Sequence, residues 1–466
     1  MTCIYIEEYD LEEVAPLDIY FNNDNFIVQT NTDTDGMLTL RIEVNIDDEY
    51  TTAIYDIARI ARPSILIVQG IISFLLDYPV TVYEIVNTKT SRSALPIFKE
   101  TSSVFKVNGK DLTNELEQIL EKISNRKTKY VAISLLDRWR KSLLLENEDD
   151  ADVLYKDEAL LGLFHILEIL SNEYSEDLKD EADIKISEFL NRYGHTVMIG
   201  ERDIERFEKE NRNAVKKLLY GGGFTFATRV KFLLSKYDIN SEREMDFVDD
   251  LIKIRNRIAH GRKTFKNSIG SMFTPFFNNS EGSENEYLLK LLVKKLLGNF
   301  FGIDAYNNEY SKQSKELLLP RVQVVKEFLN KPEEFDIKSV EDLNSNAENE
   351  FGISWINIYQ VYLKNSSKIK LDMMTVKLKV FFSCVQIDDE NWRDILCISL
   401  IFCESQCADV MEQSKKNIQK ILDSKYISTS DLMDENVELE SSGIKCDNLK
   451  AYILLINHKH SNNGKV

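Results

Sequence analysis

The spacing of hydrophobic and polar positions changes once along the chain, near residue 110. Before that point apolar residues alternate with the period of β-strands in Phe26-Ile-Val-Gln-Thr and Met37-Leu-Thr-Leu-Arg-Ile-Glu-Val, which a polar turn at residues 31–36 joins. A mostly apolar stretch at residues 60–76 predicts a helix, and further strands are expected at residues 80–86 and 98–107. These elements predict an N-terminal α+β domain spanning residues 1–110, with a sensing or regulatory role.

Helical periodicity replaces the strand pattern from Leu112 onward. Residues 111–150 predict a connecting helix and an acidic linker, whose charges gather in Glu146-Asn-Glu-Asp-Asp-Ala-Asp152. Residues 151–305 predict a compact helical block, broken by glycines at Gly221-Gly-Gly223 and Gly261. Within this block helices are expected at residues 154–174, 178–193, 203–220, 225–237 and 243–260.

The last region, residues 306–466, predicts a mainly helical structure of unknown role. Residues 330–350 are polar and acidic, which favours a linker or exposed loop, and residues 392–422 predict one long helix. The tail from Asn457 is expected to be frayed. The fold class is therefore mainly α: a central helical bundle between an N-terminal α+β domain and a C-terminal helical region.

The composition narrows the class of partner. The 466 residues carry a formal charge of −19, so general coating of nucleic acid is excluded because phosphates would meet net repulsion. The acidic start is unlike a secretory signal, and the longest apolar run, residues 64–76, is too short to span a bilayer. Six cysteines form no disulfide or metal-binding pattern, and Cys397, Cys403 and Cys407 are expected to be buried thiols. We expect a cytoplasmic protein with no membrane contact, no metal and no cofactor.

One basic stretch stands out against this acidic background. Between residues 253 and 266 there are six basic side chains and no acid: Lys253, Arg255, Arg257, Arg262, Lys263 and Lys266. A local patch of opposite sign to the whole protein predicts a phosphate-bearing partner at this place.

Arg255 and His260 are the candidate chemical groups within the basic stretch. On a helical wheel Arg255 falls inside the apolar arc of its helix, where a guanidinium requires a carboxylate or an anionic ligand. His260 precedes Gly261 and so lies on the last helical turn, one turn after Asn256, where the helix dipole favours an imidazolium. A histidine can move a proton while an arginine stabilises developing negative charge, which is what phosphodiester cleavage needs.

Two structural alternatives stand beside this interpretation. The arginine could pair with an acid and the histidine could cap carbonyl groups, with no chemistry at all. Glu168, on a helix that is apolar almost all round, could orient Arg255 or Asn256, or could be an exposed acid on a narrow polar stripe with His165.

The segment Arg255-Asn-Arg-Ile-Ala-His-Gly261 resembles the R-x4-6-H signature of HEPN-domain ribonucleases, in the form with Asn after the arginine. Upstream, Leu160-Leu-Gly-Leu-Phe-His-Ile-Leu-Glu-Ile-Leu170 and Tyr220-Gly-Gly-Gly-Phe224 resemble the earlier helices and loop of the ApeA-like and abortive-infection branches. The resemblance covers residues 150–305. It implies a HEPN-like helical domain that dimerises and cleaves RNA without a metal, in a cleft between protomers.

The resemblance also implies roles for single residues. Arg255 and His260 would be the catalytic pair and Asn256 a polar helper, in an attack by the ribose 2′-hydroxyl that leaves a cyclic phosphate. Some family members carry Tyr two places after the histidine, where a partner nucleotidyltransferase modifies it; Arg262 stands there in this chain, so that regulation is not expected.

The function that this resemblance implies is a toxic endoribonuclease of bacterial antiphage, abortive-infection defence. It would act as a homodimer and answer to a phage-derived trigger or regulatory partner, with the flanking domains restraining it. Two rival hypotheses are a non-catalytic HEPN-like module that binds RNA or protein, and a structural scaffold whose basic helix contacts an acidic neighbour such as residues 146–152.

Overall fold

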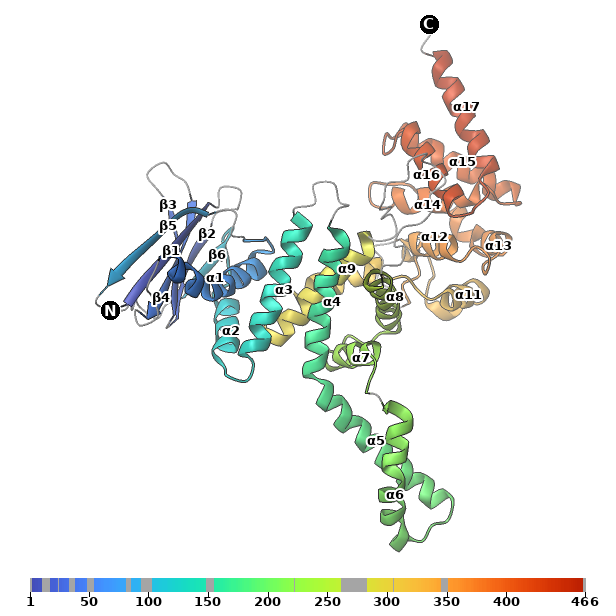
Figure 1. Ribbon diagram of the computed structural model, residues 1–466. Coiled ribbons are helices and arrows are strands. Elements are labelled where there is room, and N and C mark those ends of the chain that lie inside the picture. Colours follow the sequence, from blue (N-terminus) through green and yellow to red (C-terminus); the bar gives the residue numbers. More distant parts are fainter. Residues whose placement is uncertain are drawn as a thin grey trace. The chain divides into compact units, whose positions relative to one another are not determined.

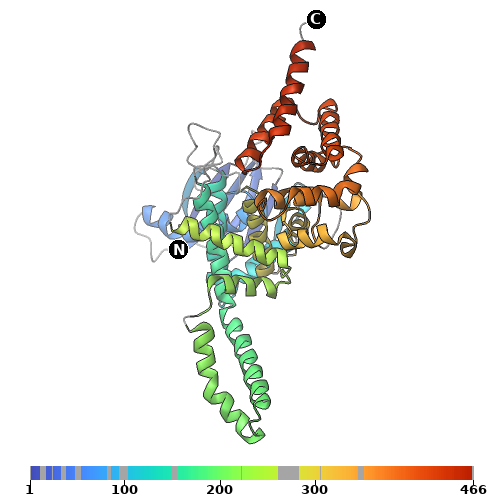
Figure 2. The same cartoon turned by 90° about the vertical axis from the view of Figure 1, so that its right-hand side faces the viewer.

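The structure is a computed structural model that describes residues 2–10, 17–23, 25–32, 38–47, 54–80, 85–93, 103–147, 155–221, 223–260, 283–304, 306–344 and 351–463. The statements that follow concern these residues. The chain forms two compact units (Figures 1 and 2). The first contains the described residues of Met1–Asn240, Val248–Thr264 and Asn285–Tyr310, and the second is made chiefly of Ser311–Val466. The boundaries expected near residues 110, 150 and 305 stay predictions.

The first unit begins with an antiparallel sheet in the order β5-β1-β4-β3-β2-β6-β7. Its strands are β1 (Thr2–Asp10), β2 (Leu17–Asn22), β3 (Phe26–Thr32), β4 (Leu38–Asp47), β5 (Ile85–Ser93), β6 (Val104–Val107) and β7 (Lys110–Asp111). The expected pairing of β3 with β4 is confirmed, with a register running from Phe26 opposite Val44 to Thr32 opposite Leu38. The turn predicted between them lies mostly outside the described residues.

Helix α1 (Ile54–Leu76) packs against the sheet, where it contacts β1 and β4. It confirms the helix expected at residues 60–76 and extends it by a turn and a half at its N-terminal end. By length and composition α1 could cross a bilayer, so the sequence-based estimate of a too-short segment was wrong. More than half of the apolar window is buried inside the protein, and Ala61, Ile65, Val68 and Ile72 are fully buried, as in the core helix of a folded domain.

The strand expected at residues 80–86 was misplaced, since β5 starts at Ile85. Val80 is instead a fully buried residue of the connection after α1, and its N–H donates to Ser73 Oγ at 2.9 Å. Its hydrophobicity serves the packing of this connection rather than a strand. Of the strand expected at residues 98–107, residues 104–107 form β6, and residues 98–102 lie outside the described part of the chain.

The expected connecting helix is two helices, α2 (Thr113–Ser124) and α3 (Lys129–Asn147). The first helix ends before Asn125, whose side chain accepts the N–H of Lys127 at 2.9 Å in the turn between them. α3 packs on α1 and on the next helix, α4, and its Trp139 is fully buried. The connecting segment therefore belongs to the core of the unit, whereas residues 148–152 of the predicted acidic linker lie outside the described residues.

The five helices expected between residues 154 and 260 are confirmed to within a few residues. They are α4 (Lys156–Glu173), α5 (Ser175–Thr196), α6 (Glu201–Tyr220), α7 (Phe226–Lys236) and α8 (Glu242–Ala259), followed by α9 (Ser283–Phe301) and α10 (Asn307–Leu317). α5 and α6 form a long antiparallel hairpin that extends from the end of α4 (Figures 1 and 2). Asp183 on α5 joins the two arms by accepting the hydroxyl of Tyr220 at 2.6 Å and pairing with Lys216.

The second unit is helical and has a core of its own. Its elements are α11 (Val322–Asn330), 3-10 helices at Pro332–Phe335 and Glu341–Leu343, α12 (Trp355–Lys364), α13 (Leu371–Ser383), α14 (Trp392–Phe402), α15 (Ala408–Asp423), α16 (Thr429–Ser441) and α17 (Asp447–Asn463). With the N-terminal sheet, these helices confirm the mainly α fold class with a C-terminal helical region.

Three details of this unit correct the expectations from sequence. Residues 330–344 are not an exposed linker, since Phe335, Ile337 and Leu343 are buried in the core. The helix expected at 392–422 is interrupted between α14 and α15, where Ser405 Oγ accepts the N–H of Cys407 at 3.0 Å. The tail is helical as far as Asn463 rather than frayed from residue 457.

Two of the three cysteines that were expected to be buried in this unit are buried. Cys397 and Cys403 are buried, and Cys407 is half-buried. Burial raises the pKa of both buried thiols to about 12, so they remain protonated and unreactive at neutral pH.

Candidate functional site

The helix that carries the predicted catalytic pair has well-defined ends. At its start, Ser241 and Glu244 form a reciprocal cap: Ser241 N and Oγ donate to Glu244 Oε2 at 2.9 and 2.8 Å, and Glu244 N donates to Ser241 Oγ at 3.3 Å. At its end, the N–H of His260 donates to the carbonyl of Asn256 at 3.2 Å. His260 therefore lies immediately after the last residue of α8, as its spacing from Gly261 predicted.

The apolar arc of α8 is buried only in its first half. Phe247, Val248 and Leu251 are buried, whereas Ile254 and Ile258 are half-buried. Arg255 was predicted to lie inside the apolar arc of its helix, and the structure shows that this part of the arc is only half-buried. The Arg255 side chain is 29% exposed, so it is within reach of both the protein and a ligand from solvent.

Three groups surround the guanidinium of Arg255. Glu168 of α4 places its Oε2 3.8 Å from Nη2, and Asn256 Oδ1 accepts from Nη1 at 3.3 Å. The ring of Phe226, the first residue of α7, lies 5.4 Å from the guanidinium carbon. The predicted contact between Glu168 and Arg255 is thus present. At 3.8 Å it is an ion pair without a hydrogen bond, and it leaves guanidinium N–H donors for an anionic ligand.

The His260 side chain is not among the groups that surround the Arg255 guanidinium. Its side chain is exposed, and five residues on an α-helix correspond to about 140° of rotation, so the two side chains leave α8 in different directions. Their structural link is the bond from Asn256 to the His260 backbone. The structure groups Arg255, Asn256 and Glu168, and it leaves the imidazole open to solvent.

The predicted RNA-binding residues divide into described and undescribed ones. Lys253 is exposed and pairs with Asp250 at 2.7 Å, whereas Arg257 is exposed and has no ion pair within the described ranges. Arg262, Lys263 and Lys266 lie outside the described residues. Of the acidic neighbour proposed in the scaffold hypothesis, Glu146 pairs with Lys290 of α9 at 2.9 Å, and residues 148–152 are not described.

The sequence did not reveal that charged groups from three helices, including Arg138 of α3, act on His165 near Arg255. His165 of α4 is exposed, one turn before Glu168, while its neighbours Phe164 and Ile166 are buried. Desolvation, then the positive charge of Arg138 on α3, lowers the pKa of the His165 imidazole; Glu168 opposes this shift and Arg255 adds to it. The spacing of His165 and Glu168 could have revealed their common face, but no pattern in the sequence pointed to Arg138.

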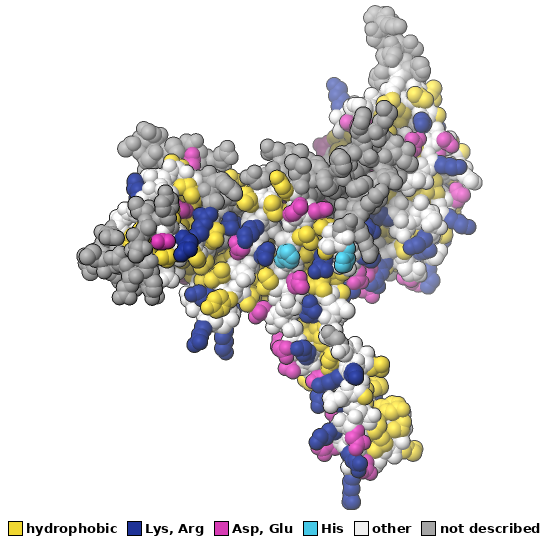
Figure 3. Space-filling view, viewed as in Figure 1, with side chains coloured by type: hydrophobic (Ala, Val, Ile, Leu, Met, Phe, Trp, Pro, Cys, Tyr) yellow, Lys and Arg dark blue, Asp and Glu magenta, His cyan; other side chains and the backbone are white. Residues whose placement is uncertain are grey.

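Figure 3 shows histidine side chains among basic and acidic ones on the face of the helical region next to the α5–α6 hairpin. This agrees with the contact between Arg255 and Glu168 and with the charged groups that act on His165. Polar groups from α3, α4 and α8 therefore meet at one surface of the first unit.

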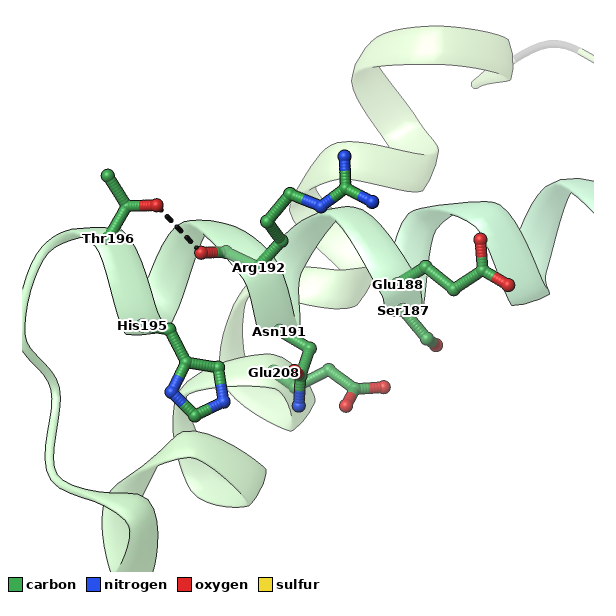
Figure 4. Close-up of a pocket in the computed structure, with 7 residues that line it drawn as sticks. All are labelled: Ser187, Glu188, Asn191, Arg192, His195, Thr196 and Glu208. Atoms are coloured by element: carbon green, nitrogen blue, oxygen red, sulfur yellow. Dashed lines mark hydrogen bonds between the residues drawn. The ribbon is translucent and has the colours of Figure 1, made fainter.

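A second cluster with a histidine and an arginine lines an open groove on the α5–α6 hairpin (Figure 4). We call it the hairpin groove and define it by Ser187, Glu188, Asn191, Arg192, His195 and Thr196 from α5 and Glu208 from α6. In Figure 4 the Arg192 side chain points away from the His195 imidazole, and the Thr196 hydroxyl donates to the Arg192 carbonyl at 2.9 Å. The groove holds two carboxylates and one guanidinium, so it does not favour a phosphate.

No protein-family model, no curated protein and no solved structure matches the chain. Within the described residues, no three His, Cys, Asp or Glu side chains are placed to hold a metal ion together.

Proposed function

We propose that this protein is a HEPN-type endoribonuclease that cleaves RNA without a metal ion. The observation that carries the proposal is the position of Arg255, oriented by Glu168 and Asn256, with guanidinium donors left for a phosphate and an exposed histidine at the end of the same helix. A buried His260 would have argued against it. The exposed imidazole is available to a substrate and to a second copy of the chain.

The reaction needs three roles from these side chains. A base takes the proton of the ribose 2′-hydroxyl, and the oxygen then forms a bond to phosphorus. The bond from phosphorus to the 5′-oxygen breaks, and an acid gives that oxygen a proton. Arg255 stabilises the negative charge that develops on the non-bridging oxygens, and the product is a 2′,3′-cyclic phosphate. In a homodimer two copies of the pair Arg255 and His260 would serve one substrate.

We propose a cytoplasmic antiphage effector as the biological setting, on the resemblance stated above. An unrestrained ribonuclease would be toxic to its own cell, so activity must wait for a phage-derived trigger or a regulatory partner. The N-terminal sheet domain and the C-terminal helical unit are the parts of the chain that such a signal could address.

The test is cleavage of total cellular RNA by purified protein in the presence of EDTA. Wild type should cleave, and His260→Ala should be slower by at least about 100-fold, the usual minimum for loss of a proton-transferring group. RNA in which the cleaved nucleotide carries 2′-deoxyribose should resist both proteins. Circular dichroism and light scattering should show that fold and oligomeric state are unchanged.

A non-catalytic RNA-binding module is the alternative, and one observation favours it. No hydrogen bond joins the side chains of Arg255 and His260, both of them described residues, and phosphate binding needs only the cations. Salt-sensitive RNA binding by a wild-type protein that leaves every RNA intact, with and without phage infection, would establish the alternative and end the ribonuclease proposal.

A further inference from the structure

Helix α4 carries a narrow polar stripe on an otherwise buried surface. Phe164, Ile166 and Leu167 are buried, whereas His165 is exposed and the Glu168 side chain is 39% exposed. Residues three apart on an α-helix share a face, so the imidazole and the carboxylate are neighbours. The stripe points toward Arg255, because Glu168 contacts that residue at 3.8 Å.

Close packing of α3 against α4 brings a second guanidinium to this stripe. A Cβ at Gly162 would lie 2.1 Å from Ser142 Oγ, so the two helices approach where α4 has no side chain. The Ser142 hydroxyl donates to the carbonyl of Arg138 at 3.0 Å, one turn earlier on α3. Gly162 is three residues before His165, and the charge of Arg138 reaches His165. We call Arg138, His165, Glu168 and Arg255 the α4 cluster.

We propose that His165 is the general base of this site, and that Arg138 and Arg255 bind the phosphate beside it. The inference rests on the proposed ribonuclease function and deepens it. His165 takes the proton from the 2′-hydroxyl as the new bond to phosphorus forms. The 5′-oxygen leaves with a proton from the imidazolium of His260, so the two histidines have different roles.

The charges around His165 suit a base that works near neutral pH. The charged groups that reach it are Arg138 from α3, Glu168 on its own helix and Arg255 from α8. Desolvation, then the charge of Arg138, disfavours the imidazolium; Glu168 opposes this effect and Arg255 adds to it, so the pKa of His165 lies below the usual histidine value of about 6.5. The neutral imidazole keeps a lone pair for the hydroxyl proton, and the same cations attract the phosphate.

The experiment compares the rate of cleavage of a fluorescent mixed-sequence RNA by wild type and His165→Asn across the pH range. The matched control is His195→Asn, which removes an exposed histidine of the hairpin groove. The wild-type rate should rise with pH through a midpoint below about 6.5, as the general base His165 loses its proton, and fall again at higher pH as the general acid loses its own. His165→Asn should lose at least about 100-fold in kcat and lose the rising part of the profile, whereas His195→Asn should behave as wild type.

A second pair of variants tests the pKa of His165 while keeping the histidine itself. Arg138→Gln removes a cation that lowers the pKa of His165, so the midpoint should move to higher pH. Glu168→Gln removes the carboxylate that raises it, so the midpoint should move to lower pH. A purely structural role would not produce opposite shifts. These shifts show whether His165 is the general base even if His165→Asn does not fold.

The outcomes separate the two proposals. If wild type cleaves RNA and His165→Asn keeps both the rate and the pH profile, His165 is not the base and the ribonuclease proposal stands. Unmoved midpoints in both Arg138→Gln and Glu168→Gln also overturn the role of His165. If wild type cleaves no RNA under any condition, the ribonuclease proposal fails instead.

Discussion

The α4 cluster and the hairpin groove use the same residue types and create opposite environments. Each presents an exposed histidine and an arginine, but the α4 cluster has two guanidiniums and one carboxylate, and the hairpin groove has one guanidinium and two carboxylates. The α4 cluster draws on α3, α4 and α8, the last of which is distant in sequence from the other two, whereas the groove is made by α5 and α6 alone. A histidine beside an arginine therefore indicates a phosphate site only where the surrounding charges agree.

The largest difference between the two regions should appear on loss of their arginines. We predict that Arg255→Gln lowers kcat for RNA cleavage by about 100- to 1000-fold, because one donor to a developing oxyanion has that effect in other enzymes. Arg192→Gln removes the guanidinium of the hairpin groove and should leave kcat within about twofold of wild type. Single-turnover cleavage assays measure both.

Arg255→Lys sharpens this prediction, because it keeps the charge and loses the planar fork of donors. A lysine also cannot be oriented by Glu168 and Asn256 in the same geometry, so most of the loss should remain. Equal losses for Arg255→Gln and Arg192→Gln would show that the two regions do not differ in the way their charges suggest.

A glycine in each region offers a comparison of packing. Gly162→Ala places a Cβ 2.1 Å from Ser142 Oγ, and we predict a loss of about 1–3 kcal/mol in the free energy of unfolding, as for other overpacked sites. Gly194 on α5 has its nearest neighbour, Phe207 Cδ1, at 3.6 Å, which is ordinary contact. Gly194→Ala should therefore gain up to about 1 kcal/mol from helix propensity.

Urea unfolding followed by circular dichroism measures both changes. The Gly162→Ala variant should also cleave RNA more slowly at a pH where it is folded, because α3 and Arg138 must move away from His165. The double variant Gly162→Ala with Ser142→Ala should recover part of the stability, since the remaining closest side-chain atom, Ser142 Cβ, is 3.3 Å away. A Gly162→Ala protein as stable as Gly194→Ala would show that the approach of α3 and α4 is looser than the structure has it.

Sequence periodicity predicted the helices between residues 154 and 260 well, because α4, α5, α7 and α8 each have a buried apolar stripe, and α6, of which only Ile204 is buried, ends before Gly221. The Thr225 side chain, for example, caps α7 by accepting the N–H of Thr228. Periodicity failed where apolar residues were sparse or continuous. Phe335 and Leu343 are buried within a polar segment, and α14 is buried continuously from Asp394 to Phe402, so its apolar run does not show where the helix ends.

The candidate site was predictable only as far as local rules extend. The contact of Glu168 with Arg255 could be expected, because a carboxylate on an apolar helix needs a partner and an arginine in an apolar arc needs an anion. The approach of Arg138 depends on Gly162, whose role appears only when α3 and α4 are packed. Tertiary contacts of this kind produce no recognisable pattern of residue spacing in the sequence.

The smallest predicted effect concerns RNA binding by single exposed cations. In a His260→Ala background, Arg257→Gln should weaken binding of single-stranded RNA and reduce the salt slope of the affinity by about 0.7, the value for one phosphate contact on a single strand. Lys253→Gln should do less, because Lys253 is already paired with Asp250. Lys217→Gln, at an exposed lysine of α6 on the hairpin, should leave the slope unchanged. Fluorescence anisotropy across a salt series measures all three. If Lys217→Gln lowers the slope as much as Arg257→Gln, RNA contacts the hairpin as well, and the contrast between the two regions no longer marks where the substrate binds.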